Sequence, residues 1–451
     1  MGDFVMDFSF SDYQRGLKGG YYEPPVNFSP YMPINIAEYK VLENEHQKKN
    51  HNVDDCFKEL YKRVGWDYYW KVYPIQNRTL NYAQMSFPAY KFILPEVLAD
   101  DWLAIVDWHK FQRDHALHQP LTAYIVLKIL TGGRNIRNAL KINGEPLLDH
   151  CVNKILEWDG TAYILKCLQS TLVEDFGNAN VLFEDNPIAR EFWKILFVEA
   201  AYLAAVFHDM GYPWQYINSL NSKLEHAGYP VDSPTSDAEK IIKVFGERLL
   251  FCPLNGYRLL DRNTPSTWPN KLVGLAAKAL RETHGLPGAI GFLYLNDVIK
   301  DFPTIKNFAI RQFCVEWAAM AIMMHDMTKI YWGDNLYASP ENSHLRLNFD
   351  TDPLSCVITL ADIIEDFERP SVNFSPDGNT TAKVKYDSHC KYTRLEWEND
   401  ATLKLSYKVT GNVRVKKESF VKEDNRKYFD MQYGYLDFSS CGVEKIYMNV
   451  F

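Results

Sequence analysis

The sequence predicts a mainly α-helical protein with an irregular N-terminal extension and a small antiparallel β unit at its C-terminus. Long segments with apolar residues at helical spacing fill the middle of the 451-residue chain. The region before them is rich in Tyr, Phe, Pro and Asn, and the region after them alternates apolar and polar residues. With 47% hydrophobic residues, the chain is long enough to bury one large core or two.

Residues 1–95 form the expected N-terminal extension. The stretch GGYYEPPVNFSPYMPINIAEY is typical of it, and no sustained helical periodicity begins before about residue 53. We expect aromatic side chains to pack this extension against the main body. The segment HQKKNHN holds two histidines, and a solvated loop is a better interpretation of it than a metal site.

Residues 96–372 form the expected helical domain. Its segments are too long for ordinary strands and carry apolar residues at helical spacing. They are PLTAYIVLKIL, AREFWKILFVEAAYLAAVF, KLVGLAAKALRE, GAIGFLYLNDVI and FAIRQFCVEWAAMAIMM.

Residues 373–451 form the expected β unit, after the boundary segment ERPSVNFSPDGNTTAK. Period-two alternation predicts strands in TRLEWEND, ATLKLSYKVTG, NVRVKKESF and VEKIYMNVF, with a hairpin turn at ENDA. The basic stretch RVKKESFVKEDNRK is interpreted as a solvated face.

Charge and cysteine usage narrow the classes of function. A net charge of -8 argues against non-specific nucleic-acid binding and favours a small-molecule partner, while a local basic pocket and a homo-oligomer are left open. The eight cysteines contain no C-x-x-C pair, which favours a reducing, cytoplasmic setting. No signal peptide and no run of 18 apolar residues is found, so we expect a protein without a membrane segment.

The stretch AVFHDMGYPW places His208 and Asp209 side by side where an apolar helix ends. Alone, this pattern is also explained by an ordinary helix end, with Gly211 past the cap and Pro213 as the stop. The same theme recurs, however, in four other helical contexts, and buried ionisable groups are costly unless paired. Imidazole and carboxylate ligands without thiolate suit Mn, Fe, Co, Ni, Zn or Mg. The candidate metal ligands are His118, His208, Asp209, His284, His325 and Asp362.

The ordered pattern H…HD…H…H…D on successive helices resembles the HD superfamily of metal-dependent phosphohydrolases. The phrases RDHALHQ, AAVFHDMGYP, ETHGLPGA, MMHDMT and DPLSCVITLADIIEDFERP resemble uncharacterised bacterial HD-domain proteins, over about residues 105–370. The resemblance implies an HD-type helical bundle. It does not imply a cyclic di-nucleotide substrate, because Tyr212 stands where the enzymes for those substrates carry a lysine.

The resemblance also implies roles for single residues. His118, His208, Asp209 and Asp362 would hold a first divalent metal ion, and Asp209 would bridge to a second ion held by His284 and His325. Two such ions hold a hydroxide and neutralise a phosphoryl group. Lys329 and Arg113 are further candidates for catalytic or substrate contacts, beside the interpretation that both are ordinary surface charges. A pair between Glu365 and Arg369 along one helix is expected.

These residues favour a dinuclear phosphohydrolase or phosphodiesterase for a small phosphorylated metabolite, such as a nucleotide or cyclic nucleotide. One alternative is a di-iron oxygenase resembling inositol oxygenase, because that enzyme has nearly the same ligand pattern. Another is a non-catalytic nucleotide sensor. The order of the ligands does not separate these chemistries.

Overall fold

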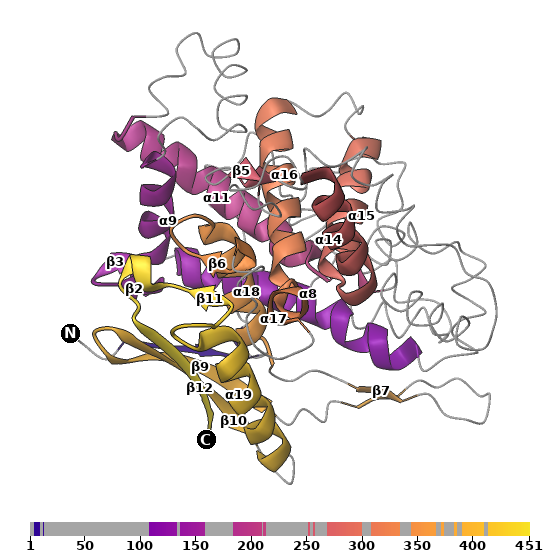
Figure 1. Ribbon diagram of the computed structural model, residues 1–451. Helices are drawn as coiled ribbons and strands as arrows, with labels where there is room; N and C mark the ends of the chain where they lie inside the picture. The colour runs from indigo at the N-terminus through magenta and orange to yellow at the C-terminus, as the bar shows by residue number, and fades with distance from the viewer. Residues whose placement is uncertain are drawn as a thin grey trace, which may run out of the picture.

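The computed structural model of the protein describes part of the chain, and in that part it is mainly α-helical (Figure 1). The described residues are 4–9, 12, 108–132, 136–157, 184–209, 211–212, 251–252, 256–257, 268–299, 308–333, 344–366, 371–373, 383–385, 390–409 and 414–451.

The five helical segments expected from the apolar spacing are all helical, so this part of the prediction is confirmed. The helices are α8 (Trp108–Thr131), α9 (Leu147–Leu156), α11 (Pro187–Phe207), α14 (Trp268–Glu282), α15 (Gly285–Ile299), α16 (Phe308–His325), α17 (Thr328–Trp332), α18 (Pro353–Ile364) and α19 (Arg414–Phe429).

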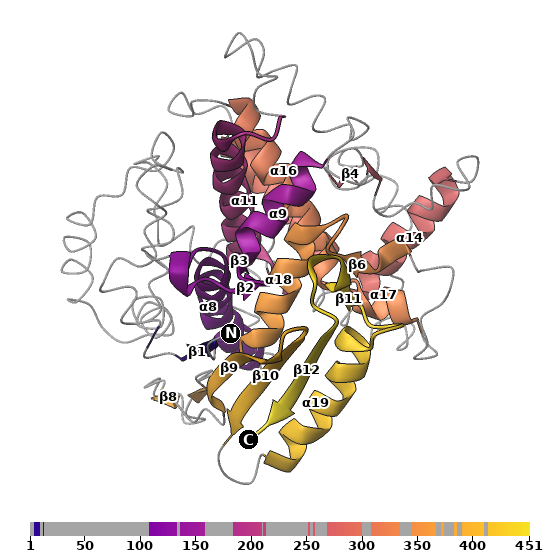
Figure 2. The ribbon, with the colours of Figure 1, turned by 90° about the vertical axis from the view of Figure 1, so that its left-hand side faces the viewer.

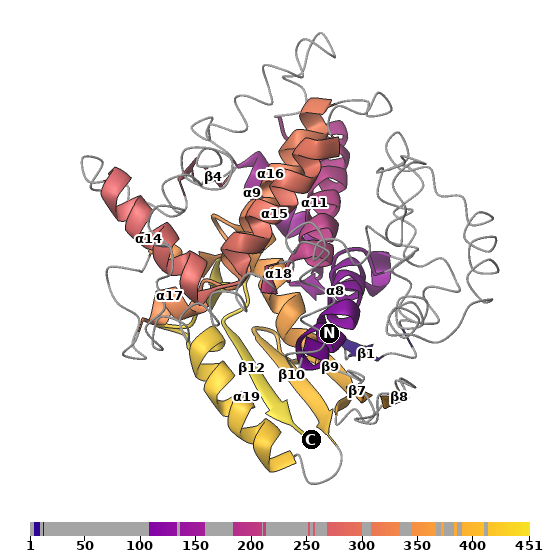
Figure 3. The ribbon, with the colours of Figure 1, turned by 90° about the vertical axis from the view of Figure 1, so that its right-hand side faces the viewer.

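Helices α8, α11, α16 and α18 pack against one another and form the core of the helical part. Helix α16 is apolar around most of its circumference and buried along most of its length, as expected for a helix covered by neighbours on several sides. Trp193 and Phe197 of α11 meet Phe313 and Trp317 of α16 edge to face. Figure 3 shows α15 lying alongside α16 on the outer side of this core.

Helix α8 begins earlier than the sequence suggests. The expected helical segment PLTAYIVLKIL begins at Pro120, but α8 runs from Trp108 through Pro120 to Thr131. A proline inside a helix removes one backbone hydrogen bond. Burial of residues 121–127 against α11 and α18 offsets this loss, so that His118 lies inside a helix rather than before one.

A four-stranded sheet lies below the helical part, with the strand order β1-β9-β10-β12. Its strands are β1 (Val5–Phe8), β9 (Cys390–Asn399), β10 (Thr402–Val409) and β12 (Lys445–Val450). The turn expected at ENDA joins β9 to β10. The expectation of a purely antiparallel unit is wrong, because β12 runs parallel to β10. A parallel neighbour requires a crossover connection, and α19 lies within that connection.

The segment NVRVKKESF was expected as a strand, but its residues from Arg414 onward belong to α19. Ion pairs one helical turn apart join Arg414 to Glu418 and Lys427 to Glu423. Figure 2 shows α19 alongside β12 at the end of the sheet. Local charge pairing and docking on β12 therefore outweigh the alternation of Val and Phe that suggested a strand.

Strand β1 joins the beginning of the chain to the C-terminal sheet. It pairs antiparallel with β9, and Arg394 of β9 contacts both carboxylate oxygens of Asp7 at 2.6 and 2.9 Å. Phe8 packs edge to face on Tyr124 of α8. The rest of the expected extension, including residues 46–52, lies outside the described residues apart from 4–9 and 12. The boundaries after residues 95 and 372 stay predictions.

Short two-stranded ladders complete the described structure. Asn143 and Gly144 both have positive φ in the tight turn of the first ladder, as a two-residue hairpin loop requires. The ladders are β2 (Lys141–Ile142) with β3 (Glu145–Pro146), β4 (Phe251–Cys252) with β5 (Gly256–Tyr257), β6 (Leu347–Asn348) with β11 (Leu436–Asp437), and β7 (Ser371–Asn373) with β8 (Lys383–Lys385).

Five cysteines whose side chains are described are buried free thiols, as expected for small core residues. They are Cys151, Cys314, Cys356, Cys390 and Cys441. Within the described part of the chain, every helix is too short or too polar to cross a membrane.

Candidate metal centre

The six side chains expected as metal ligands meet at one place, although they come from five separate segments. We call them the His/Asp cluster. Helix α8 supplies one, the end of α11 two, the junction of α14 and α15 one, the end of α16 one and the last turn of α18 one. They are His118, His208, Asp209, His284, His325 and Asp362.

One half of the His/Asp cluster is centred on His118. Its Nε2 atom lies 2.7 Å from Oδ1 of Asp362 and 3.0 Å from Nε2 of His208. Oδ1 of Asp362 is also 3.5 Å from Nε2 of His208. The donor atoms of these three side chains therefore face one small volume between α8, α11 and α18.

The other half joins His284 to His325, whose Nε2 atoms are 3.0 Å apart. Asp209 lies between the two halves. Its Oδ1 is 3.1 Å from Nε2 of His284 and 3.8 Å from Nε2 of His325, whereas its Oδ2 faces Nε2 of His118 at 3.5 Å. Oδ1 is also 3.4 Å from Nε2 of His208, so the carboxylate of Asp209 contacts histidines of both halves.

The Nδ1 atom of each histidine is held by an acceptor outside the His/Asp cluster. His208 donates to the carbonyl of Ala205 at 2.8 Å, and His325 donates to that of Ile322 at 2.6 Å. These bonds lie within the last turns of α11 and α16. A carbonyl only accepts, so Nδ1 carries the proton in both rings, and Nε2 of the neutral ring presents a lone pair.

Carboxylates hold the other two rings in the same way. Nδ1 of His118 donates to Glu365, which is buried just after α18, and Nδ1 of His284 donates to Asp326 at 2.8 Å. Asp326 also accepts the backbone N–H of His284 at 2.7 Å. Acceptors of this kind on the far nitrogen are typical of metal-binding histidines, because they fix the tautomer and the ring orientation.

This donor set fits a divalent metal ion. Four Nε2 lone pairs and two carboxylates converge within a buried volume, an arrangement that is repulsive unless positive charge lies between them. Three overlapping sets of three ligand atoms lie within 4.8 Å of one another. Imidazole and carboxylate together suit Zn, Mn, Fe, Co or Ni. The residues present therefore match the group that the sequence implies.

The charges and the burial of the site shift the pKa values of its side chains in opposite directions. Burial alone would lower the pKa of His284, but Asp326 and Asp209 raise it to about 10. Burial lowers the pKa of His325 to about 4, with His284 and His208 adding to the effect. Burial opposes ionisation of Asp362, yet His118 and His208 hold its pKa well below the usual range. The charges of the site thus favour positive charge at His284 and a neutral imidazole ring at His325.

The site is open to solvent on one side. The side chain of Asp362 is 29% exposed, whereas the other members of the His/Asp cluster are buried.

Glycines allow the ligand-bearing segments to approach so closely. A Cβ atom on Gly211 would lie 1.9 Å from the carbonyl oxygen of His284 and 2.6 Å from the backbone nitrogen of Gly288. One on Gly285 would lie 2.6 Å from the carbonyl oxygen of Met323. Gly211 does not have positive φ. Close backbone approach, rather than the left-handed cap considered for it, therefore explains a glycine at this position.

An aromatic ring covers His284. The ring of Tyr212 stacks on its imidazole with a centroid distance of 3.9 Å and an interplanar angle of 17°. Together with Asp326, this contact fixes the His284 ring in position and in rotation.

The structure describes the side chain of only one of the two other proposed catalytic residues. Lys329 is exposed on α17 and its Nζ donates to the carbonyl of Glu282 at 3.3 Å. Burial would raise the pKa of Asp326, but His284 lowers it, and Lys329 is close enough to add to this lowering. The side chain of Arg113 lies outside the described residues.

Glu365 has a role that the sequence did not predict. The expected pair with Arg369 required one continuous helix, but α18 ends at Ile364 and Glu365 has extended backbone, with φ -76° and ψ 98°. Arg369 lies outside the described residues. The change of backbone direction turns the Glu365 carboxylate toward His118. Its spacing of three residues from Asp362 was the only available signal.

Comparison of the chain with protein-family models, with curated proteins and with solved structures finds no match. The resemblance to HD-domain proteins therefore stays a prediction that depends on the residues themselves.

We expect Gly211→Ala to lower the free energy of unfolding by about 3 kcal/mol or more, because the new methyl group overlaps backbone atoms that cannot move independently. Thermal or urea unfolding measures this. Gly274→Ala is the matched control: it lies on the exposed face of α14 with nothing within 4 Å of its Cβ position. The free energy of unfolding of Gly274→Ala should be higher than that of the wild type by roughly 0.5–1 kcal/mol. Equal stability of the two variants would contradict the close approach.

We expect Glu365→Gln to weaken metal binding about 10- to 100-fold, because the neutral amide no longer strengthens the basicity of His118. Competition with a chromophoric chelator measures the dissociation constant. In Glu398→Gln, which removes an exposed partner of Tyr447, metal affinity should stay unchanged. An unaltered affinity in Glu365→Gln would show that the contact with His118 is only structural.

Proposed function

We propose that the protein is a dinuclear metal-dependent phosphohydrolase of the HD type that acts on a small phosphorylated metabolite. The convergence of four Nε2 lone pairs and two carboxylates in the His/Asp cluster carries the proposal. The order of these residues along the chain, with its resemblance to HD phosphohydrolases, supports the hydrolytic reaction. A nucleotide or cyclic nucleotide is the favoured substrate class, and a cytoplasmic location follows from the cysteine usage.

The proposed division of ligands follows the contacts. His118, His208 and Asp362 would hold one divalent ion, and His284 with His325 would hold the other. Asp209 would serve both, because its carboxylate lies between the two halves and contacts histidines of each. When bound, two such ions lower the pKa of water toward neutrality and stabilise the charge of a phosphoryl group under attack.

The surrounding residues would keep the ligands in the state that metal binding needs. Glu365 and Asp326 hold the Nδ1 protons of His118 and His284, and backbone carbonyls do the same for His208 and His325. No ligand ring then has to rotate or exchange tautomers when an ion enters. The exposed edge at Asp362 would admit the substrate, and the buried half would exclude bulk water.

The reaction class can be tested separately from the metal site. With Mn²⁺ or Mg²⁺, release of inorganic phosphate from nucleotides or cleavage of bis(p-nitrophenyl) phosphate would support the hydrolase. Tightly bound iron with oxygen consumption and no phosphoester cleavage would replace it with the oxygenase. A nucleotide that raises the melting temperature but is recovered unchanged would replace it with a sensor.

We expect reconstituted wild-type protein to hold about two metal ions per chain, and Asp209→Ala to hold about none, since both halves lose a ligand. His325→Ala should keep about one. Elemental analysis after gel filtration measures the stoichiometry. Asp366→Ala is the control, because Asp366 pairs with Lys417 outside the His/Asp cluster.

Full metal content in Asp209→Ala would contradict the shared carboxylate. If wild-type protein binds no metal after reconstitution, the six residues are structural and the proposed catalytic function is wrong.

We expect Lys329→Ala to raise KM by roughly threefold to tenfold with little change in kcat, the effect of losing one charged contact to a phosphate oxygen near the rim of the site. Steady-state kinetics on the phosphoester substrate measure both constants. Lys278→Ala is the control: Lys278 lies 3.9 Å from the carboxylate of Glu282, whose carbonyl accepts from Lys329. An equal KM in both variants would make Lys329 an ordinary surface lysine.

A further inference from the structure

Two buried tyrosines of the C-terminal segment contact the helix ends that carry metal ligands. The hydroxyl of Tyr407, on β10, donates to the carbonyl of Ile363 at 2.7 Å. The hydroxyl of Tyr435, just before β11, donates to the carbonyl of Met324. Ile363 directly follows Asp362, and Met324 directly precedes His325. Each hydroxyl thus acts one residue away from a member of the His/Asp cluster.

Both acceptors belong to the last turn of a helix, where carbonyl groups lack partners within the helix. At the end of α18, the N–H of Glu365 bonds the carbonyls of Ala361 and Asp362, and Tyr407 bonds that of Ile363. At the end of α16, the side chain of His325 donates to the carbonyl of Ile322, and the carbonyl of Met324 accepts the hydroxyl of Tyr435 beside the N–H of Met327 at 3.3 Å. The tyrosines therefore complete the helix ends that orient the ligands.

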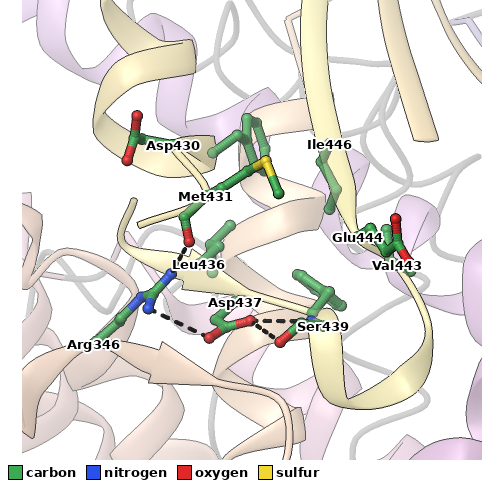
Figure 4. A pocket seen from close by; sticks show the side chains of 11 residues that line it. Arg346, Asp430, Met431, Leu436, Asp437, Ser439, Val443, Glu444 and Ile446 are labelled. Atoms are coloured by element: carbon green, nitrogen blue, oxygen red, sulfur yellow. Dashed lines mark hydrogen bonds and ion pairs between the residues drawn. The ribbon is translucent and has the colours of Figure 1, made fainter. Parts of the chain in front are cut away.

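The segment that carries Tyr435 is itself fastened to the helical part. The N–H of Leu347 donates to the carbonyl of Tyr435 at 2.9 Å, next to the short ladder of β6 with β11. Arg346 donates to the carbonyls of Gly434 and Met431 at 2.9 and 3.1 Å, and its Nη1 lies 3.4 Å from Asp437 (Figure 4). Hydrogen bonds thus hold the carbonyl of Tyr435 and the carbonyl of Gly434, the residue before it.

The cavity of about 210 Å³ in Figure 4 lies beside this attachment and contains no member of the His/Asp cluster. Several of its polar side chains are engaged with one another or with nearby backbone, as in the contacts from Asp437 to Arg346 and Ser439. The cavity is lined by Arg346 and by residues between 429 and 446, where the C-terminal segment contacts the helical part.

We propose that Tyr407 and Tyr435 are positioning residues of the metal centre, so that residues 390–451 complete the site instead of forming a separate module. Tyr407 sets the last turn of α18 and with it Asp362. Tyr435 sets the last turn of α16 and with it His325. The inference depends on the proposed metal centre, and it assigns one tyrosine to each half of it.

The test uses the full chain loaded with Co²⁺, whose visible absorption reports the geometry of its ligands. Tyr407→Phe and Tyr435→Phe each remove one hydroxyl and keep the ring. Each should weaken Co²⁺ binding about tenfold, the lower part of the range for outer groups that orient ligands, and shift the ligand-field bands. Tyr435→Phe should affect the ion of the His325 half, and Tyr407→Phe that of the Asp362 half.

Tyr331→Phe is the matched control. Tyr331 is buried on α17, and its hydroxyl donates to the carbonyl of Tyr433 at 3.0 Å in the same C-terminal segment. Its ring, which the variant keeps, lies 5.5 Å from the ring of Tyr435 between centroids, so the variant removes only a hydroxyl that does not bond a ligand-bearing helix end. It should lose similar thermal stability with unchanged Co²⁺ affinity and spectrum. If Tyr407→Phe and Tyr435→Phe behave like Tyr331→Phe in all three measurements, they are only structural and the inference is wrong.

The outcomes separate this inference from the proposed function. Wild-type protein that binds no Co²⁺ overturns the metal centre and the inference together. Wild-type protein that binds Co²⁺ normally, with both variants unchanged, overturns the inference alone. If one variant does not fold, the other still decides, because the two tyrosines act on different helices.

Discussion

The electrostatics of the His/Asp cluster constrain the rest of the fold. Its six side chains lie close together in a largely buried space, and in each of two histidine pairs the Nε2 atoms are 3.0 Å apart. Two carboxylates and four lone pairs cannot share such a volume at low cost without a cation. Without an ion, carboxylates near His284 raise its pKa to about 10, so a proton there supplies part of the missing charge. A divalent metal ion would supply more positive charge, so metal binding would also stabilise the fold.

The arrangement of the helices meets this constraint in two ways. His208 and Asp209 follow α11, His325 ends α16, and Asp362 lies in the last turn of α18. The C-terminal end of a helix carries partial negative charge, so three helix ends directed at one point add to the attraction for a cation. Glycines then allow backbone atoms to touch: Gly211 against His284, and Gly285 against Met323. Longer side chains at these positions would separate the ligands.

The sequence made the grouping of these six side chains predictable because five of them stand at or near helix ends, whereas His118 lies inside α8. The sequence was less informative wherever distant parts of the chain meet. Glu365 and His118 are 247 residues apart, and their contact depends on how α18 ends. Helix α8 continues through Pro120 because burial outweighs the lost bond, and α19 is a helix although Val and Phe alternate there. Local propensity decided neither case, since packing on α11, α18 and β12 did.

The pairing of β12 parallel to β10 connects the C-terminal strand with the His/Asp cluster. A parallel neighbour requires a crossover, and the crossover contains α19 and the turn that leads to Tyr435. An antiparallel hairpin, as the alternation suggested, needs only a short turn and would leave no such connection to lie against α16. The topology of the sheet therefore decides which residues reach the ends of the ligand-bearing helices. Tyr435 comes from the crossover, so its contact with Met324 depends on this parallel pairing, whereas Tyr407 lies on β10, which is also held by its antiparallel pairing with β9.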